Sequence, residues 1–203
     1  MRRTDNIQEV PMARKSLILL LSAMLAVSLV FFLPGCGQGD VGKANTYIEN
    51  GDFYAVKLVP EGKKLEAALK DFFNTLIGLD PESVGKPGGP LDKYNSALFV
   101  SIWLAEHANV EYKRVLDLKA SEEQKTYADM MIKVTKKTLA LLEFIKAWFS
   151  KALNVIITKN PTKIKDYLTG EEFTNGQSQI AIMSDQIDKL AEEALQYKQS
   201  KNL

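Results

Sequence analysis

The sequence predicts an all-α protein: an elongated antiparallel four-helix bundle with a short extra N-terminal helix over residues 44–49. Beyond residue 43, apolar residues recur at alternating spacings of three and four, and no segment alternates apolar and polar residues as a strand would. Capping residues and a segment rich in proline and glycine divide this region into long helical stretches. The composition is that of a globular protein, with 46% hydrophobic and 25% charged residues among 203.

The first helix, residues 44–49, is expected to stop at Asn50-Gly51, because glycine favours helix ends. Asp52 is a suitable N-cap for a second helix that reaches about residue 77 and is kinked or restarted at Pro60. One face of that helix is apolar and carries Leu58, Leu65, Leu69, Phe72 and Leu76. Residues 79–90 are rich in proline and glycine, which predicts a loop.

Two longer helices follow, over residues 91–118 and about 121–158. The apolar seam of the first consists of Tyr94, Leu98, Ser101, Ala105, Ala108, Tyr112 and Val115. Ser121 and Gln124 match a capping box that opens the second helix, and Asn160-Pro161 ends it. Its seam consists of Tyr127, Met131, Val134, Thr138, Leu141, Ile145, Trp148, Ala152 and Val155. Spacing of this regularity predicts helices that pack nearly parallel to one another.

The last helix is expected to open at a second capping box, formed by Thr169 and Glu172. Its seam consists of Phe173, Gly176, Ile180, Met183, Ile187, Leu190, Ala194 and Tyr197. Gly176 is its weakest position, since glycine costs ~1 kcal/mol relative to alanine inside a helix.

The N-terminal region has the pattern of an export signal. Arg14 and Lys15 precede an apolar run over residues 17–33, so the basic end stays in the cytoplasm while the apolar run enters the membrane. Met12 offers a second start site besides Met1 and would give a more compact signal.

Leu33-Pro34-Gly35-Cys36 resembles the lipobox of bacterial lipoproteins, in which a small residue precedes a cysteine. The resemblance covers the leader alone. It implies that diacylglycerol is attached to the thiol of Cys36 and that a signal peptidase cuts before this residue. The expected organisation is then a signal peptide over residues 1–36, a flexible tether over 37–43 and a helical bundle over 44–203.

An uncleaved membrane helix is the rival interpretation of the leader. Seventeen apolar residues span ~26 Å, slightly less than the ~30 Å hydrocarbon core of a bilayer. Both interpretations place residues 37–203 outside the cytoplasm. In the lipoprotein family an aspartate after the cysteine favours retention in the inner membrane, so Gly37 points to the outer membrane in a cell that has one.

Few residues suit catalysis or cofactor binding. His107 is the single histidine. Glu111 lies one helical turn away and is the one further candidate ligand beside it, so no metal site is expected. Motifs for haem attachment, phosphate loops and serine nucleophiles are absent, so neither a cofactor nor catalytic residues are expected. The net charge is +1, which argues against nucleic-acid binding. We therefore expect a protein that is not an enzyme.

Two surfaces are candidates for contacts with other molecules. Residues 97–105 and 139–149 are apolar nearly all round, which fits core burial or a groove for an apolar ligand or partner helix. Such a groove would be lined by Phe99, Trp103, Trp148 and Phe149. Residues 119–165 hold ten lysines and four acids, whereas residues 166–203 hold seven acids and three lysines. These segments are expected to pair across the bundle, or else to offer a basic face to anionic lipid or cell-wall polymer.

The leading hypothesis is a cell-envelope lipoprotein, held on the non-cytoplasmic side of a membrane, whose bundle binds or scaffolds another envelope protein. The alternative is a carrier that holds a lipid or another apolar small molecule between its helices.

Overall fold

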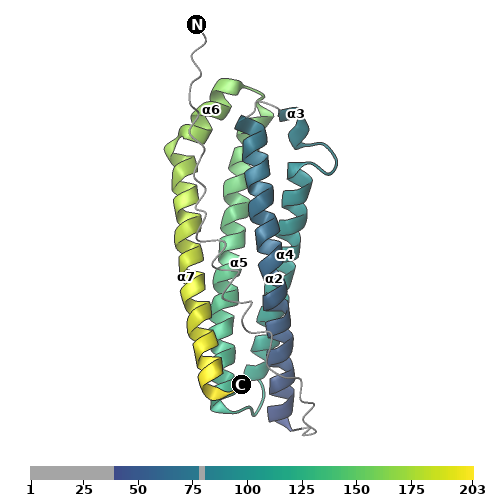
Figure 1. The fold of residues 1–203 in the computed structure, drawn as a ribbon, viewed down its shortest axis with the longest axis vertical. Coiled ribbons are helices and arrows are strands. Elements are labelled where there is room, and N and C mark those ends of the chain that lie inside the picture. Colours follow the sequence, from purple (N-terminus) through teal and green to yellow (C-terminus); the bar gives the residue numbers. More distant parts are fainter. Residues whose placement is uncertain (1–38, 78–80) are drawn as a thin grey trace.

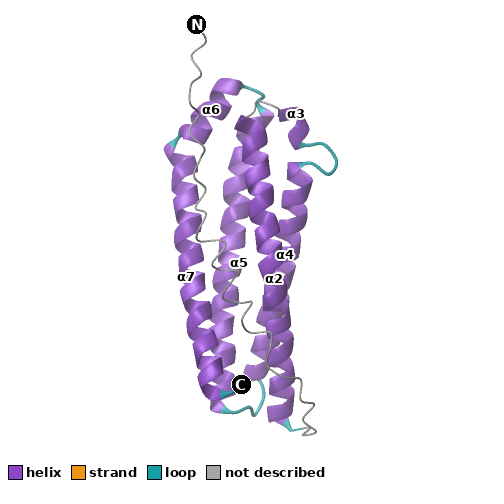
Figure 2. Cartoon of the chain, viewed as in Figure 1, coloured by secondary structure: helices purple, strands orange, loops and turns teal. Residues whose placement is uncertain are grey.

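The computed structural model describes residues 39–77 and 81–203. Within this part of the chain every regular element is a helix, as Figure 2 shows. The expected all-α four-helix bundle is confirmed: four long helices run along one axis, and each is antiparallel to the next (Figure 1). The expected signal peptide and Cys36 lie outside the described residues.

The four long helices are α2 (Asp40–Ile77), α4 (Pro90–Leu116), α5 (Glu122–Ile157) and α7 (Glu171–Lys201). Two short helices, α3 (Pro81–Val84) and α6 (Pro161–Thr169), lie at one end of the bundle. The start of α2 and the C-terminus lie at the other end. Helix α2 packs mainly on α4, α4 packs also on α5, and α7 packs mainly on α5.

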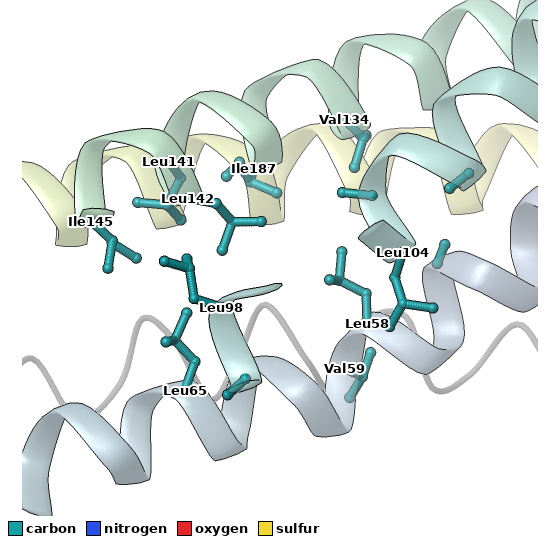
Figure 3. Packing of buried hydrophobic residues seen from close by; sticks show 14 of the residues in the cluster. Leu58, Val59, Leu65, Leu98, Leu104, Val134, Leu141, Leu142, Ile145 and Ile187 are labelled. Atoms are coloured by element: carbon teal, nitrogen blue, oxygen red, sulfur yellow. The ribbon is translucent and has the colours of Figure 1, made fainter. Parts of the chain in front are cut away.

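The core is drawn from all four long helices. Figure 3 shows leucine, isoleucine and valine side chains from facing helices meeting along the axis, among them Leu58, Leu98, Leu142 and Ile187. All seven seam residues predicted for α4 are buried, as are those predicted for α5 except the half-buried Val155. The predicted seam of α7 is looser: four of its members are half-buried, namely Ile180, Met183, Leu190 and Tyr197.

The prediction of a separate helix over residues 44–49 is wrong. Helix α2 continues without a break through Asn50-Gly51 and through Pro60, and it begins at Asp40, inside the expected tether. The reason lies in a neighbouring helix. A Cβ atom on Gly51 would lie 2.6 Å from Cε1 of Tyr112, so this glycine gives the aromatic ring room against α2. Asp52 is likewise no N-cap, because its carboxylate bonds to side chains of other helices.

Some helix boundaries agree with the capping residues and loop signals in the sequence, and others do not. Ser121 and Gln124 form the predicted capping box at the start of α5. The second predicted capping box is absent, because Gly170 occupies the N-cap of α7 and the hydroxyl of Thr169 donates to the Lys165 carbonyl in α6. Asn160-Pro161 opens α6, with the Asn160 side chain as cap, rather than simply ending α5. The expected loop over residues 79–90 contains α3.

Candidate functional site

The four aromatic residues expected to line one groove lie in two separate places. Trp148 and Phe149 are core residues with 5% and 1% exposure. Phe149 stacks on Tyr94 with ring centroids 3.7 Å apart, and Trp148 packs on Phe173 at 5.2 Å. Their rings are therefore occupied by neighbouring rings from α4 and α7.

Phe99 and Trp103, in contrast, lie on the outside of α4 and are 71% and 42% exposed. One helical turn separates them, so both project from the same side of the helix. Further residues of α2 and α4 extend this surface. We call it the aromatic face, and it consists of Phe53, Tyr54, Phe99, Trp103, His107 and Val110.

Ring contacts join the two helices of the aromatic face. Tyr54 on α2 meets Trp103 edge-on at 5.7 Å and His107 at 5.4 Å. His107 also packs on Trp103 with centroids 3.9 Å apart. Tyr54 thus lies beside the packed pair of Trp103 and His107 and contacts both rings, so the three side chains restrict one another's positions.

The α2 edge of the aromatic face is marked by Phe53, which is 52% exposed and contacts Tyr54 at 5.6 Å. The ammonium group of Lys57 lies 4.0 Å from the centroid of the Phe53 ring, a cation–π contact. Val110, at 46% exposure, extends the apolar surface along α4. Large exposed apolar groups that adjoin one another mark sites of contact with other molecules more often than scattered ones do.

His107 and Glu111 do not share a ligand site. Nδ1 of His107 donates to the carbonyl oxygen of Trp103 at 2.7 Å, since a carbonyl can only accept. The Glu111 carboxylate accepts instead from Arg114 at 2.5 Å and from Asn50 at 3.5 Å. Across residues 39–77 and 81–203, no three histidine, cysteine or acidic side chains are grouped closely enough to hold a metal ion.

A shallow groove of about 790 Å³ lies farther along α2 and α4, toward the end that carries α3. Ala68 and Ala97, both buried, lie at its base. An ion pair crosses between the helices there, from Lys93 to Asp71 at 3.1 Å. The groove is thus open and charged at its margin, unlike the enclosed apolar sites that hold most small ligands.

A second cluster lies inside the bundle and joins all four long helices. Oδ1 of Asp52 on α2 accepts hydrogen bonds from the hydroxyls of Tyr112 on α4 and Tyr127 on α5, each at 2.7 Å. Its other oxygen pairs with the Lys198 ammonium of α7, which also lies 5.3 Å from the Tyr127 ring centroid. The side chains of Asp52 and Lys198 are only 12% and 16% exposed.

The electrostatics of this cluster favour a structural role. Burial, reinforced by the negative charge of Asp52, raises the pKa of Tyr112 and of Tyr127 well above 10. Both phenols therefore remain protonated and act as hydrogen-bond donors. Neither is a reactive phenolate, and the carboxylate they bind has its charge matched by Lys198.

The expected pairing between the lysine-rich and acid-rich segments is small in extent. Within the described residues, one ion pair joins α5 to α7, between Lys151 and Glu172 at 2.6 Å. Lys198 instead reaches α2, and Lys189 pairs with Asp185 within its own helix. Most of the remaining lysines of α5 are exposed.

Sequence reasoning missed most members of the aromatic face, namely Phe53, Tyr54, His107 and Val110. Helical spacing places Val110 seven residues after Trp103, on the same side, and that signal could have found it. The pairing of Tyr54 with Trp103 and His107 depends on the register between α2 and α4, which no local pattern encodes.

Comparisons with protein-family models, with curated proteins and with solved structures found no match. Among the described helices, none is both long enough and apolar enough to cross a bilayer.

Proposed function

We propose that this chain is a cell-envelope lipoprotein, not an enzyme, whose helical bundle is anchored through lipid on Cys36 and binds another envelope protein through the aromatic face. The observation that carries the binding proposal is the pair Phe99 and Trp103, exposed on α4 beside the rings of α2. The resemblance of Leu33-Pro34-Gly35-Cys36 to a lipobox supports the anchor.

The position of Cys36 fixes which end of the bundle would lie near the membrane. Asp40, the first residue of α2, follows it by four positions, a distance of at most about 14 Å when fully extended. Phe53 lies thirteen residues into that helix, or ~20 Å along its axis. The aromatic face would then stand above the bilayer surface, where it can reach a protein but not the hydrocarbon core.

The chemistry of the aromatic face suits protein contacts. Tryptophan and tyrosine supply much of the binding energy in protein interfaces, because they bury a large area with few rotatable bonds. The rings of Tyr54, Trp103 and His107 are already held by one another, so binding would cost little side-chain entropy. A carrier function, in contrast, has no specific support, since Trp148 and Phe149 are packed in the core.

The anchor is tested by Cys36→Ser, which removes the thiol that would carry lipid. We expect the variant to leave the membrane fraction, whereas the parent chain stays in it. Combining Cys36→Ser with Ser200→Cys keeps one thiol in the chain but moves it to the exposed C-terminal end, and this control should also be released. Membrane retention of both variants would instead support an uncleaved membrane helix.

The binding surface is tested by Trp103→Ala, with Leu116→Ala as its matched control. Both positions lie on α4 and are similarly exposed, at 42% and 40%, but Leu116 is outside the aromatic face. After crosslinking in membranes, Trp103→Ala should lose the crosslinked protein and Leu116→Ala should retain it. Equal recovery with both variants would show that the partner binds elsewhere.

A further inference from the structure

We infer that the envelope protein seated on the aromatic face is a second copy of this chain, parallel to the first and related to it by a two-fold axis along the bundle. This inference rests on the proposed membrane anchoring. The partner of the aromatic face is then a second copy of this chain, and oppositely charged side chains of the two copies are expected to pair.

The short tether brings the two faces to the same height. With at most about 14 Å of chain between Cys36 and α2, every anchored copy stands with the same end toward the membrane. A two-fold axis perpendicular to the membrane leaves heights unchanged. Each aromatic face therefore meets the identical face of its neighbour in register, as an isologous contact requires.

The charges at the two edges of the aromatic face are complementary under this symmetry. Lys57 lies at the α2 edge, over the Phe53 ring. Glu106 is exposed on α4, next to His107 in sequence but on the side turned away from Tyr54. The two-fold axis places α2 of one copy opposite α4 of the other, so that Lys57 of each copy faces Glu106 of its neighbour.

The heights of Lys57 and Glu106 agree with this pairing. Tyr54 contacts both Trp103 and His107, so residue 54 of α2 lies level with about residue 105 of α4. Because the helices are antiparallel, Lys57 and Glu106 differ in height by slightly more than one helical turn, ~6 Å. Their flexible side chains can span this offset. Within one copy, Glu106 has no ion-pair partner among the described residues.

The aromatic face is small, so two copies are expected to bind each other only where anchoring holds them close together. Its six side chains are fewer than the roughly 20–30 residues per side of a standard stable interface, so the contact is weak between free molecules. Anchoring both copies in one membrane raises their effective concentration. The pair is therefore expected on the membrane.

The test is crosslinking of the full chain in its own membrane. Lipid on Cys36 leaves Val110→Cys as the single free thiol, and a short bis-maleimide should then join two copies. Ile182→Cys is the matched control, since Ile182 on α7 is 52% exposed against 46% for Val110 but lies outside the aromatic face. We expect a dimer band from Val110→Cys and little or none from Ile182→Cys.

Charge reversal tests the symmetry itself. In the Val110→Cys background, Lys57→Glu or Glu106→Lys alone places like charges opposite each other twice in every pair, and the dimer band should fall several-fold. The double variant restores opposite charges between copies and should restore the band. All three positions are exposed, so the bundle should fold normally in each variant, which far-ultraviolet circular dichroism can verify.

Four outcomes contradict the inference, and they differ in what they say about the proposed function. If Val110→Cys crosslinks to a different protein, the binding proposal stands and the second copy is wrong. If the dimer band ignores the charge reversals, or never forms while the chain remains in the membrane, the paired arrangement is wrong. If the chain is soluble with its leader attached, both the anchoring and the pair on the membrane are wrong.

Discussion

Gly176 allows α7 to lie close to the indole ring of Trp148. A Cβ atom at this position would lie 2.1 Å from Nε1 of Trp148, far inside van der Waals contact. The sequence suggested that this glycine merely weakens its helix. The structure shows that the lack of a side chain at Gly176 permits the contact between α5 and α7. Helix propensity alone suggests that alanine would stabilise the protein here, whereas this contact implies that alanine destabilises it.

Gly176→Ala should therefore destabilise the bundle, although alanine is the better helix former. Forcing a methyl group against a core ring typically costs about 1–3 kcal/mol, more than the ~1 kcal/mol gained in helix propensity. Gly85→Ala is the control, because nothing lies within 4 Å of its added Cβ. Urea unfolding should show a lower midpoint for Gly176→Ala than for Gly85→Ala; a stabilised Gly176→Ala would contradict the close approach of α7 to Trp148.

Asp188 on α7 gives the stability of the bundle a pH dependence. Burial, aided by the nearby Asp185, raises its pKa from 3.8 to about 7, and its Oδ1 has no hydrogen-bond partner. The folded chain thus holds this proton more tightly than the unfolded chain does. The stabilising contribution is complete below about pH 4 and is lost as the pH rises through about 7.

Asp188→Asn should remove this dependence. Relative to the parent chain, the variant should gain in free energy of unfolding as the pH rises from 4 to 8, because the parent alone must keep a charged group partly buried. The exposed Glu143 provides Glu143→Gln as a control, whose difference from the parent should change little. Urea titrations at pH 4, 6 and 8 measure the difference in free energy of unfolding between each variant and the parent chain. If this difference is the same at all three pH values for Asp188→Asn, the pH dependence does not come from Asp188.

At the scale of the element, two similar capping signals had different outcomes. Ser121 and Gln124 bond reciprocally at the start of α5. Thr169 and Glu172 have the same spacing, but Thr169 is the last residue of α6. Its hydroxyl donates a hydrogen bond to the Lys165 carbonyl within that helix and does not cap α7. The sequence could not distinguish the two cases, because nothing in the local pattern revealed α6 itself.

Substituting the two capping residues separates these roles. Ser121→Ala should lower the free energy of unfolding by ~1 kcal/mol, the usual cost of losing an N-cap. Thr169→Ala should have a much smaller effect, since its exposed hydroxyl only bonds within α6. Chemical denaturation of the two variants side by side tests this difference, and equal losses would show that Thr169 does cap α7.

Helix α2 shows most clearly where local patterns fail. Asn50-Gly51-Asp52 has the composition of a helix end followed by a helix start. In the bundle, Gly51 makes room for Tyr112, and Asp52 accepts bonds from two other helices. Contacts distant in sequence therefore overrode the local propensity, and no pattern within α2 could have indicated them.

For the whole molecule, periodicity predicted the architecture better than the site. The repeats of three and four located the core of α4 and α5 because burial depends on helix face alone. The repeats placed Trp148 on the seam of α5 and left Phe99 and Trp103 off the seam of α4. Residues 97–105 and 139–149 are nevertheless apolar nearly all round, which suggested one shared groove instead of two separate places. Phe99 and Trp103 face solvent because they lie on the outer side of α4, whereas Trp148 and Phe149 on α5 pack against rings of α7 and α4.

The Asp52 cluster should govern the stability of the whole bundle, because it ties α2, α4, α5 and α7 at one point. Asp52→Ala leaves the Lys198 ammonium largely buried without its partner, which typically costs about 3 kcal/mol or more. Combining Asp52→Ala with Lys198→Met removes both charges and should recover part of the loss. A double-mutant cycle by urea unfolding measures the coupling; additive losses would show that the pair is not coupled.

The most direct measurement is the intact mass of the chain purified from its own membranes. We expect a polypeptide that begins at Cys36, with the leader removed and diacylglycerol on its thiol. A chain that keeps residues 1–35, carries a bare thiol at position 36 and is recovered in the soluble fraction would contradict the anchored bundle.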